Sequence, residues 1–415
     1  MSCSSSSRAG SPLGRPANMV HQTMNTSTAS ASRASSRISS MRRFPVLAAI
    51  LGMLAACATA PLPPPDEAAP PAPLNPAPAG APWPPPLQQA KSRWQPVPWS
   101  ELPGFGEDAM HEAWNAWVKS CERPPAAFAA LCPQVRQLSI ATPEEQRAWM
   151  TQRLQPYRVE PLQAGAEGLL TGYYEPLLEA SRQPTARHTV ALYRPPAGLA
   201  SRRPWYTRQE IDTPGPAREA LRGREIAWLA DPLDALVVQI QGSGRVRITE
   251  ADGSQRMVRL AFAGSNEQPY RSIGAWLLQQ GAIRDASWPG IKAWAAQNPQ
   301  RVNEMLWSNP RVVFFREEPL SELDAGFGPR GAQGVALTPG RSIAVDKDSI
   351  PYGTPVWLAS PGPLAKLQRL VLAQDTGSAI VGALRADYFT GWGAEAGELA
   401  GRLKQPLRLW VLWPK

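Results

Sequence analysis

Histidine is scarce in this 415-residue chain, which contains only His21, His111 and His188. Cysteine is nearly as rare, with four residues, and no two of them form a C-x-x-C pair. A histidine-based zinc site or a Ser-His-Asp triad would depend on His111 and His188, because His21 lies in a leader segment. Thiolate metal clusters are equally disfavoured. We therefore expect no metal and no cofactor, and chemistry that is carried by acids.

The formal net charge of +9 overstates how basic the working protein is. Six arginines and no acid precede Cys57, and without them the remainder carries only +3. Those arginines are Arg8, Arg15, Arg33, Arg37, Arg42 and Arg43. A charge this small is not the footprint of a nucleic-acid-binding protein, so we expect no nucleic-acid partner.

Residues 1–56 are interpreted as a leader and lipoprotein signal. Met41-Arg42-Arg43 is a charged start, and residues 44–53 form an apolar run too short to span a bilayer. Leu54-Ala55-Ala56-Cys57 then resembles a bacterial lipobox, which predicts lipidation of Cys57 and a membrane partner through the lipid anchor. Because Asp after the cysteine marks inner-membrane retention in such proteins, Ala58 implies an outer-membrane lipoprotein facing the periplasm. An ordinary signal with an incidental cysteine is the alternative.

Residues 57–98 are dense in proline and alanine and are predicted to be a tether. Such a run favours polyproline II and cannot build a core; about thirty residues of it would reach ~90 Å. A flexible spacer without a fixed reach is the alternative.

The roughly 310 residues that follow are enough for a large core and two domains. Helical spacing predicts a helix over residues 108–121, and Thr142 is a plausible N-cap for another that begins at Pro143. Cys121 and Cys132 close a short loop and are disulfide candidates in an oxidising periplasm, with two free thiols as the alternative.

From about Gly168 the sequence has the texture of β structure. Short apolar runs punctuated by glycine and proline are interpreted as strands at 235–241, 257–262, 312–315, 370–374 and 407–412. Residues 272–280 and 288–297 are predicted as helices between strands.

Three aspartates near the C-terminus are the main candidates for chemistry. Asp375 ends the apolar run 370–374, and Asp387 follows twelve positions later. A carboxylate at the end of a buried strand is costly unless it is paired or functional. Asp346 lies upstream, and we expect a structural or groove role for it. The bland alternative makes all three turn or strand-end residues that cap backbone amides.

Five motifs in order resemble the membrane-bound lytic transglycosylase A family, over residues 99–415. They are GLLTGYYEP (168–176), VQIQGSGR (238–245), PYRSIG (269–274), NP (309–310) with FFRE (314–317), and the three-aspartate segment 337–392. The resemblance implies a mainly β fold with some helices: a double-psi β-barrel domain with a second β-barrel domain inserted. The implied parts are an N-terminal part at 99–167, the inserted domain at 168–310, and a C-terminal part at 311–415.

The resemblance also implies an activity. Members of the family cleave the β-1,4 bond between N-acetylmuramic acid and N-acetylglucosamine in peptidoglycan and leave a 1,6-anhydro end. Motif alignment makes Asp387 the single general acid and then base. Asp375 would be the close partner whose charge or hydrogen bonding keeps Asp387 protonated. Peptidoglycan glycan strands are the implied partner.

Candidate substrate-binding residues follow from the same motifs. They are Tyr173, Tyr174, Glu175, Gln239, Gln241, Gly242, Ser243, Gly244, Thr376, Gly377 and Trp392. On a strand, Gln239 and Gln241 would share one face that binds sugar, with solvent exposure as the alternative. Gly242–Gly244 is interpreted as a turn that lets glycan approach the backbone, and Tyr173 is as well suited to core packing. Arg245 and Arg385 are candidates to pair with peptide carboxylates.

Three other functions remain open at this point. Asp375-Thr376-Gly377 copies the aspartic protease signature, but those enzymes need two such loops, so the chain would have to act as a dimer. The others are a non-catalytic peptidoglycan-binding lipoprotein and a barrel glucanase that hydrolyses with water.

Overall fold

The structure is a computed structural model, and it describes residues 83–163 and 168–415. The predicted signal, the lipidation site Cys57 and most of the tether lie outside these residues. Within this described part of the chain, no helix is both long and apolar enough to cross a membrane.

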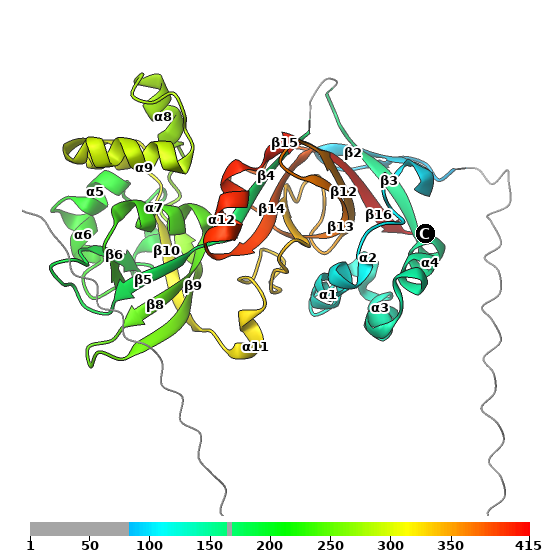
Figure 1. Cartoon of the computed structure of the whole chain (residues 1–415), viewed down its shortest axis with the longest axis horizontal. Coiled ribbons are helices and arrows are strands. Elements are labelled where there is room, and N and C mark those ends of the chain that lie inside the picture. Colours follow the sequence, from blue (N-terminus) through cyan, green and yellow to red (C-terminus); the bar gives the residue numbers. More distant parts are fainter. Residues whose placement is uncertain (1–82, 164–167) are drawn as a thin grey trace, which may run out of the picture. The chain divides into compact units, whose positions relative to one another are not determined.

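A ten-stranded sheet is built from the first and last strands of the described part of the chain (Figure 1). Its order is β1-β2-β3-β16-β12-β13-β11-β14-β4-β15, and only the pairs β13–β11 and β14–β4 are parallel. The strands are β1 Leu87–Gln88, β2 Ser92–Pro96, β3 Leu154–Pro161, β4 Leu169–Glu175, β11 Ser342–Val345, β12 Pro355–Pro361, β13 Lys366–Asp375, β14 Arg385–Trp392, β15 Lys404–Pro406 and β16 Arg408–Pro414.

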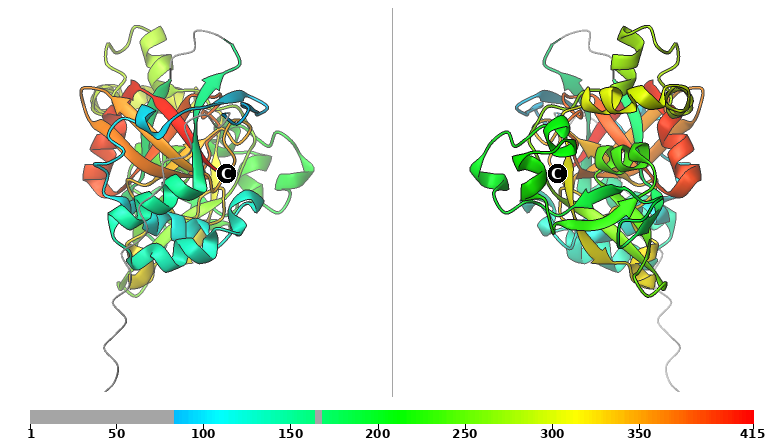
Figure 2. Two further views of the ribbon diagram at one scale, coloured as in Figure 1. Left: turned by 90° about the vertical axis from the view of Figure 1, so that its right-hand side faces the viewer. Right: turned by 90° about the vertical axis from the view of Figure 1, so that its left-hand side faces the viewer.

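A separate six-stranded sheet, in the order β10-β9-β8-β5-β7-β6, comes from the middle of the chain. The right-hand view of Figure 2 looks toward it (green). Its end strands β10 and β6 contact each other, so it is nearly closed into a barrel. The strands are β5 Leu177–Ser181, β6 Val190–Tyr193, β7 Glu225–Leu229, β8 Ser243–Thr249, β9 Gln255–Ser265 and β10 Val313–Pro319. The predicted fold class, mainly β with one β domain inserted into another, is confirmed.

Strand pairing divides the chain differently from the predicted domain bounds. β4 begins after residue 168 but pairs with β14 in the first sheet, and β10 begins after residue 310 but pairs with β9 in the second. The tether also ends before residue 98, since β1 and β2 already belong to the ten-stranded sheet. By strand pairing, the inserted unit extends from β5 to β10.

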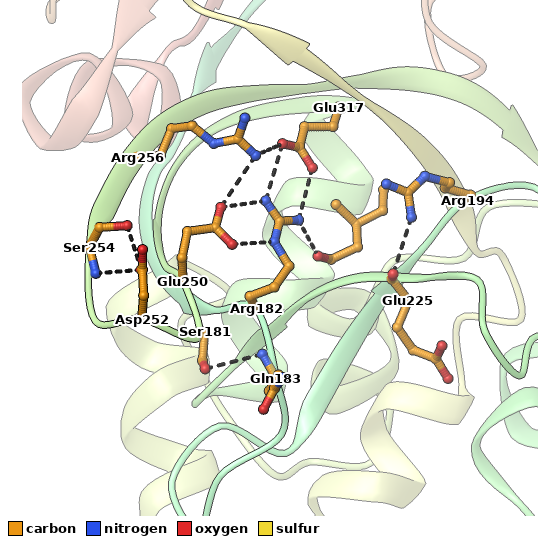
Figure 3. Close-up of polar contacts among 11 residues, drawn as sticks. Ser181, Arg182, Gln183, Arg194, Glu225, Glu250, Asp252, Ser254, Arg256 and Glu317 are labelled. Atoms are coloured by element: carbon orange, nitrogen blue, oxygen red, sulfur yellow. Dashed lines mark hydrogen bonds and ion pairs between the residues drawn. The ribbon is translucent and has the colours of Figure 1, made fainter.

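Charged side chains link strands of the inserted sheet, including strands that are not paired directly with each other. Arg182 follows β5 and donates to both Glu250, beyond β8, and Glu317 on β10, with nitrogen–oxygen distances of 2.8–3.2 Å (Figure 3). It also donates to the Ile226 carbonyl of β7 at 2.6 Å. One guanidinium therefore connects four strands, helped by Arg256, which contacts the same two glutamates.

The helices cover the sheets. They are α1 Met110–Ser120, α2 Ala126–Ala129, α3 Cys132–Gln137, α4 Pro143–Arg153, α5 Arg208–Asp212, α6 Pro216–Ala220, α7 Pro232–Gln241, α8 Ile273–Gln279, α9 Trp288–Gln297, α10 Val302–Trp307, α11 Glu322–Ala325 and α12 Gly393–Arg402. Four short 3₁₀ turns accompany them at Trp99–Glu101, Leu138–Ile140, Leu199–Ser201 and Pro299–Arg301.

Helix α1 buries Trp114 and Trp117 against the ten-stranded sheet, in the same cluster as Trp357 and Trp410. All four predicted helices are confirmed: they are α1 (predicted at 108–121), α4 (from 143), α8 (272–280) and α9 (288–297). Helix α4 begins with a Thr142–Glu145 capping box. A disulfide joins Cys121 at the end of α1 to Cys132 at the start of α3.

The strand predicted at 235–241 is wrong, because this segment is the C-terminal part of helix α7. Asp231 caps its first turn through the Leu233 amide at 2.8 Å, Pro232 occupies the first position, and Gly242 ends it with φ +80°. A short apolar run fits a buried helix as well as a strand, and the capping residues on each side decide between them.

Candidate active site

The two candidate acids lie in one row across four strands. Thr171 on β4 pairs with Asp387 on β14, which pairs with Ala344 on β11, which in turn pairs with Asp375 on β13. Residues directly opposite each other in a sheet point to the same face. Two strand spacings put the Cα atoms of the acids roughly 10 Å apart. Ala344 is the residue paired with both acids, and the register of β11 and β13 shifts between Ile343 and Ala344.

Asp387 is held by a hydroxyl rather than by a cation. The Thr171 hydroxyl donates to Asp387 Oδ1 at 2.5 Å, and Arg385 Nη2 donates to the Thr171 oxygen at 2.8 Å. Burial raises the pKa of Asp387, and the Thr171 hydrogen bond and the Arg385 charge oppose that rise without cancelling it. A direct arginine pair would instead lower the pKa and keep the acid ionised.

Asp375 has a hydrogen-bond donor at each oxygen. The Tyr173 hydroxyl donates to Oδ2 at 2.9 Å, and the Ala332 amide donates to Oδ1 at 3.0 Å. Burial raises its pKa to about 6 against these donors and the Thr376 amide, and the negative charge of Asp387 raises it further. Among the described residues, no donor reaches Asp387 Oδ2. Asp387 Oδ2 is therefore the carboxylate oxygen that is best placed to carry a proton, because both Asp375 oxygens already act as acceptors.

Asp346 is placed away from this row and has a structural role. It accepts from Lys91 Nζ at 2.9 Å, the Gly382 amide at 2.8 Å and the Asp348 amide at 3.1 Å. Burial raises its pKa, but these donors outweigh that effect and the net pKa is lowered. Since Gly382 lies in the loop that joins Asp375 to Asp387, Asp346 anchors the connection between the two acids.

The three candidates on β4 lie in different surroundings. Tyr173 shares the face of the acids, whereas Tyr174 lies on the opposite face and lines a cavity of about 930 Å³ beside α12. Glu175 has no exposed surface and binds Arg245 at 2.8 Å and Arg259 at 2.6 Å. Glu175 is therefore not a groove residue: it is a buried ion-pair centre between the two sheets.

The candidates between 239 and 244 are also rearranged, because α7 replaces the predicted strand. Gln239 accepts from Arg208 Nη2 at 2.6 Å, and Gln241 accepts from the Tyr174 amide at 3.0 Å. They no longer share a sugar-binding face. Ser243 and Gly244 are buried in β8, where a Cβ on Gly244 would come within 2.7 Å of Val238, so close packing requires this glycine.

The remaining candidates lie at the ends of β13 and β14. Thr376 is exposed directly after Asp375, its hydroxyl donates to the Val345 carbonyl at 3.0 Å, and Gly377 follows it. Trp392, at the end of β14, is 36% exposed and has the Arg245 guanidinium 3.9 Å from its ring centroid. Arg245 is therefore committed to Glu175 and Trp392 and is not free to bind a peptide carboxylate.

Sequence reasoning missed Thr171 and Ala344. Thr171 lies two positions before Tyr173, so strand alternation was enough to place both on one face. Ala344 carries no local signal, because its position between the acids depends on pairing among β13, β11 and β14. In the described residues, no cluster of three or more His, Cys, Asp or Glu side chains is arranged to hold a metal ion.

Two family models match the chain in succession. One, described as the MltA specific insert domain, matches residues 169–316, and the other, described as the 3D domain, matches residues 341–413. The first begins at β4 and ends within β10, and the second runs from β11 into β16 and contains all three aspartates.

Curated relatives carry the name membrane-bound lytic murein transglycosylase A. The Vibrio cholerae protein is 30% identical over 256 residues, and the Escherichia coli K12 protein is 33% identical over 256 residues. The matches cover 59% and 58% of this chain, but 65% and 64% of those proteins, just under two thirds of their length.

Solved structures match over more of the chain. The lytic transglycosylase LtgG of Burkholderia pseudomallei is 44% identical with a TM-score of 0.55, and the match covers 81% of this chain and 100% of that one. A membrane-bound lytic murein transglycosylase from Agrobacterium tumefaciens is 30% identical with a TM-score of 0.67, covering 77% and 97%.

Proposed function

The chain belongs to the membrane-bound lytic murein transglycosylase A family, and from this premise we propose that it is a peptidoglycan lytic transglycosylase. Its reaction cleaves the β-1,4 bond between N-acetylmuramic acid and N-acetylglucosamine. The muramic acid C6 hydroxyl, rather than water, becomes the acceptor, so the product ends in a 1,6-anhydro ring.

The observation that carries the proposal is the unequal hydrogen bonding of the two acids in one row. Asp387 has an oxygen without a donor, and burial keeps its pKa raised, so it is suited to deliver a proton. Asp375 has both oxygens occupied by donors, so it is less suited than Asp387 to deliver a proton.

Asp387 would act twice in the reaction. It first protonates the glycosidic oxygen, which leaves as the hydroxyl of N-acetylglucosamine while the bond to the anomeric carbon breaks. The Asp387 carboxylate then removes the proton of the C6 hydroxyl, whose oxygen bonds to that carbon. Ordinary glycosidases need a second carboxylate as nucleophile or base, whereas the internal hydroxyl makes one acid sufficient here.

The alternative functions are not favoured. An aspartic protease needs two Asp-Thr-Gly loops that share a proton, whereas Asp375 is hydrogen-bonded by Tyr173 and Ala332 of its own chain. A non-catalytic binding protein would have no use for two acids that are kept partly buried without a cation in direct contact.

The cellular location is also part of the proposal. The curated relatives are named membrane-bound, and we propose that lipidated Cys57 anchors this chain in the outer membrane, facing the periplasm. Replacing Cys57 by Ala should release the protein from the outer-membrane fraction. If the variant still fractionates like the parent, the anchor assignment is wrong.

Mass spectrometry of purified peptidoglycan after digestion tests the activity. We expect 1,6-anhydromuramoyl products that form equally well with EDTA present. Products that all carry reducing ends, each heavier by one water, would show hydrolysis and contradict the proposal. Loss of product in EDTA would contradict the cofactor-free reaction.

A further inference from the structure

A small polar cavity of about 40 Å³ lies where the inserted domain meets the loop after Asp375. Its lining includes Arg208, Gln239 and Arg311 from the inserted domain, together with Ser378. Ser378 is three residues after Asp375, so their Cα atoms are at most about 11 Å apart. The cavity therefore adjoins the acid row but faces it from the inserted domain.

Arg208 brings a buried cation to this cavity. Its side chain is 6% exposed and donates to the Asn309 carbonyl at 3.1 Å, and to Gln239 Oε1 and the Arg311 carbonyl at 2.6 Å. Among the described residues, no carboxylate forms an ion pair with it. Asp212, one turn along α5, is nearby but accepts from Trp307 at 3.0 Å. Burial lowers the Arg208 pKa to about 10, as expected for an incompletely compensated charge.

Arg311 adds a second cation that is partly exposed. Its Nη1 donates to the Gln268 carbonyl at 3.1 Å, and burial lowers its pKa. Glu267 is the nearest acid that acts on it, but Glu267 lies 3.5 Å from Arg203 instead. Within the described part of the chain, neither lining arginine has a carboxylate in direct contact. Buried positive charge of this kind is costly unless an anion compensates it.

We propose that this cavity is a subsite for a substrate carboxylate, with Arg311 as its accessible ligand and Arg208 as its fixed charge. The proposal rests on the proposed function. At about 40 Å³ the cavity is far smaller than the roughly 300–1,000 Å³ pockets that enclose whole small molecules, so it is sized for a group such as a carboxylate and not for a sugar ring. Muramic acid carries such a group on its lactyl ether or, further out, on its peptide stem, whereas N-acetylglucosamine has none.

The position of the subsite gives it a role in orientation. The negative charge of Asp375 repels a second carboxylate, so a substrate that carries one is best accommodated with that group turned toward the arginines. Only muramic acid supplies a carboxylate that can pair with the two arginines. The subsite would therefore distinguish muramic acid from N-acetylglucosamine at the reacting position.

Binding to the Asp387→Asn protein, in which turnover is blocked, tests the subsite by calorimetry. Three hexasaccharides serve as probes: chitohexaose, a denuded glycan with free lactyl carboxylates, and the same glycan with tetrapeptide stems. Adding Arg311→Gln should weaken binding of the carboxylate ligand roughly tenfold or more, the size of a lost charge-assisted hydrogen bond. Chitohexaose affinity should stay within about twofold.

The pattern of losses identifies the carboxylate. Loss only for the denuded glycan assigns the lactyl carboxylate, because the stem peptide is attached through that carboxyl as an amide. Loss only for the peptide-bearing glycan assigns a carboxylate of the stem, and loss for both shows that the subsite accepts either one. Arg311→Lys should retain part of the affinity, and Arg247→Gln is the matched control, because Arg247 pairs with Glu179 at the surface. Equal weakening of all three probes would overturn the subsite. Unchanged binding of both carboxylate-bearing glycans would also overturn it. If no probe binds before Arg311 is changed, the proposed function itself fails, and the subsite with it.

Discussion

Glu175 and the pair Asp375–Asp387 show how one chain uses buried acids in two ways. Glu175 has no exposed surface and is held by two arginines, at 2.8 Å and 2.6 Å. Asp375 and Asp387 are partly buried, and their donors are hydroxyls and backbone amides. All three lie at strand ends or near them, so position alone does not separate the two uses.

The difference lies in the partner of each carboxylate. A cation in direct contact fixes an acid as a carboxylate and makes it a structural link between the two sheets. A hydroxyl or amide satisfies the oxygen without fixing the charge, so burial can raise the pKa and the acid can exchange a proton. At Asp387 the arginine is present, but Thr171 stands between it and the acid.

The largest effect should come from Asp387→Asn. General acid–base catalysis typically contributes ~10²–10⁴-fold, and one residue serves both half-steps here. The variant should fold and bind glycan while nearly all turnover is lost. Asp375→Asn should retain more activity, because Asp375 only tunes its neighbour. Steady-state rates on purified peptidoglycan measure both, and an active Asp387→Asn beside an inactive Asp375→Asn would exchange the two roles.

Glu175→Gln should act on stability instead. It leaves Arg245 and Arg259 buried without their counter-ion, and breaking such a cluster costs about 3–5 kcal/mol of unfolding free energy. The matched control is Glu179→Gln, whose partner Arg247 lies at the surface, and which should cost no more than about 1 kcal/mol. Denaturant unfolding compares them; equal losses would show that the Glu175 cluster is not special.

Asp375→Asn should stabilise the protein at pH 7, the opposite sign to Glu175→Gln. The folded pKa of about 6 lies above the unfolded value near 3.9, so stability rises as pH falls between them. The ionised acid therefore costs about 3 kcal/mol at pH 7, and Asn removes this cost while losing about 1 kcal/mol of hydrogen bonding. The gain should vanish at pH 4. Destabilisation of the variant at pH 7 would show that Asp375, like Glu175, is an acid whose charge stabilises the fold.

Asp346→Asn should give the smallest effect, a loss of about 1–2 kcal/mol at pH 7 from weaker bonds to Lys91 and Gly382. The folded pKa of Asp346 is lowered, so its contribution is present above the unfolded pKa and is lost as pH falls through the folded one. Asp348→Asn, at an exposed neighbour, should stay within about 0.5 kcal/mol. Unfolding at pH 7 and pH 3 compares the pair, and equal losses would remove the special role of Asp346.

Local signals predicted much of this molecule. Helical spacing marked α1, Thr142 before Pro143 marked the start of α4, and the apolar run before Asp375 marked β13. The fold class followed from ordered motifs. Each of these depends on residues that are close together in sequence.

Features that depend on distant partners escaped prediction. Glu175 was interpreted as a groove residue because nothing near it shows that Arg245 and Arg259 approach from β8 and β9. The sheet membership of β4 escaped prediction for the same reason, since it is decided by the pairing of β4 with β14. At 235–241 the signals were local, in Asp231, Pro232 and Gly242, but the apolar run was weighted above its caps.

The pairing of β4 with β14 has a consequence for how the protein is made. More than two hundred residues separate Thr171 from Asp387, and they include the whole inserted domain. Thr171 and Asp387 can pair only after these residues have been synthesised. Contacts of such long range form late, since closing a large loop is entropically costly. A nascent chain that ends before β14 lacks Asp387 and therefore has no acid pair. The proposed cleavage of peptidoglycan can begin only after β14 has been synthesised and has paired with β4.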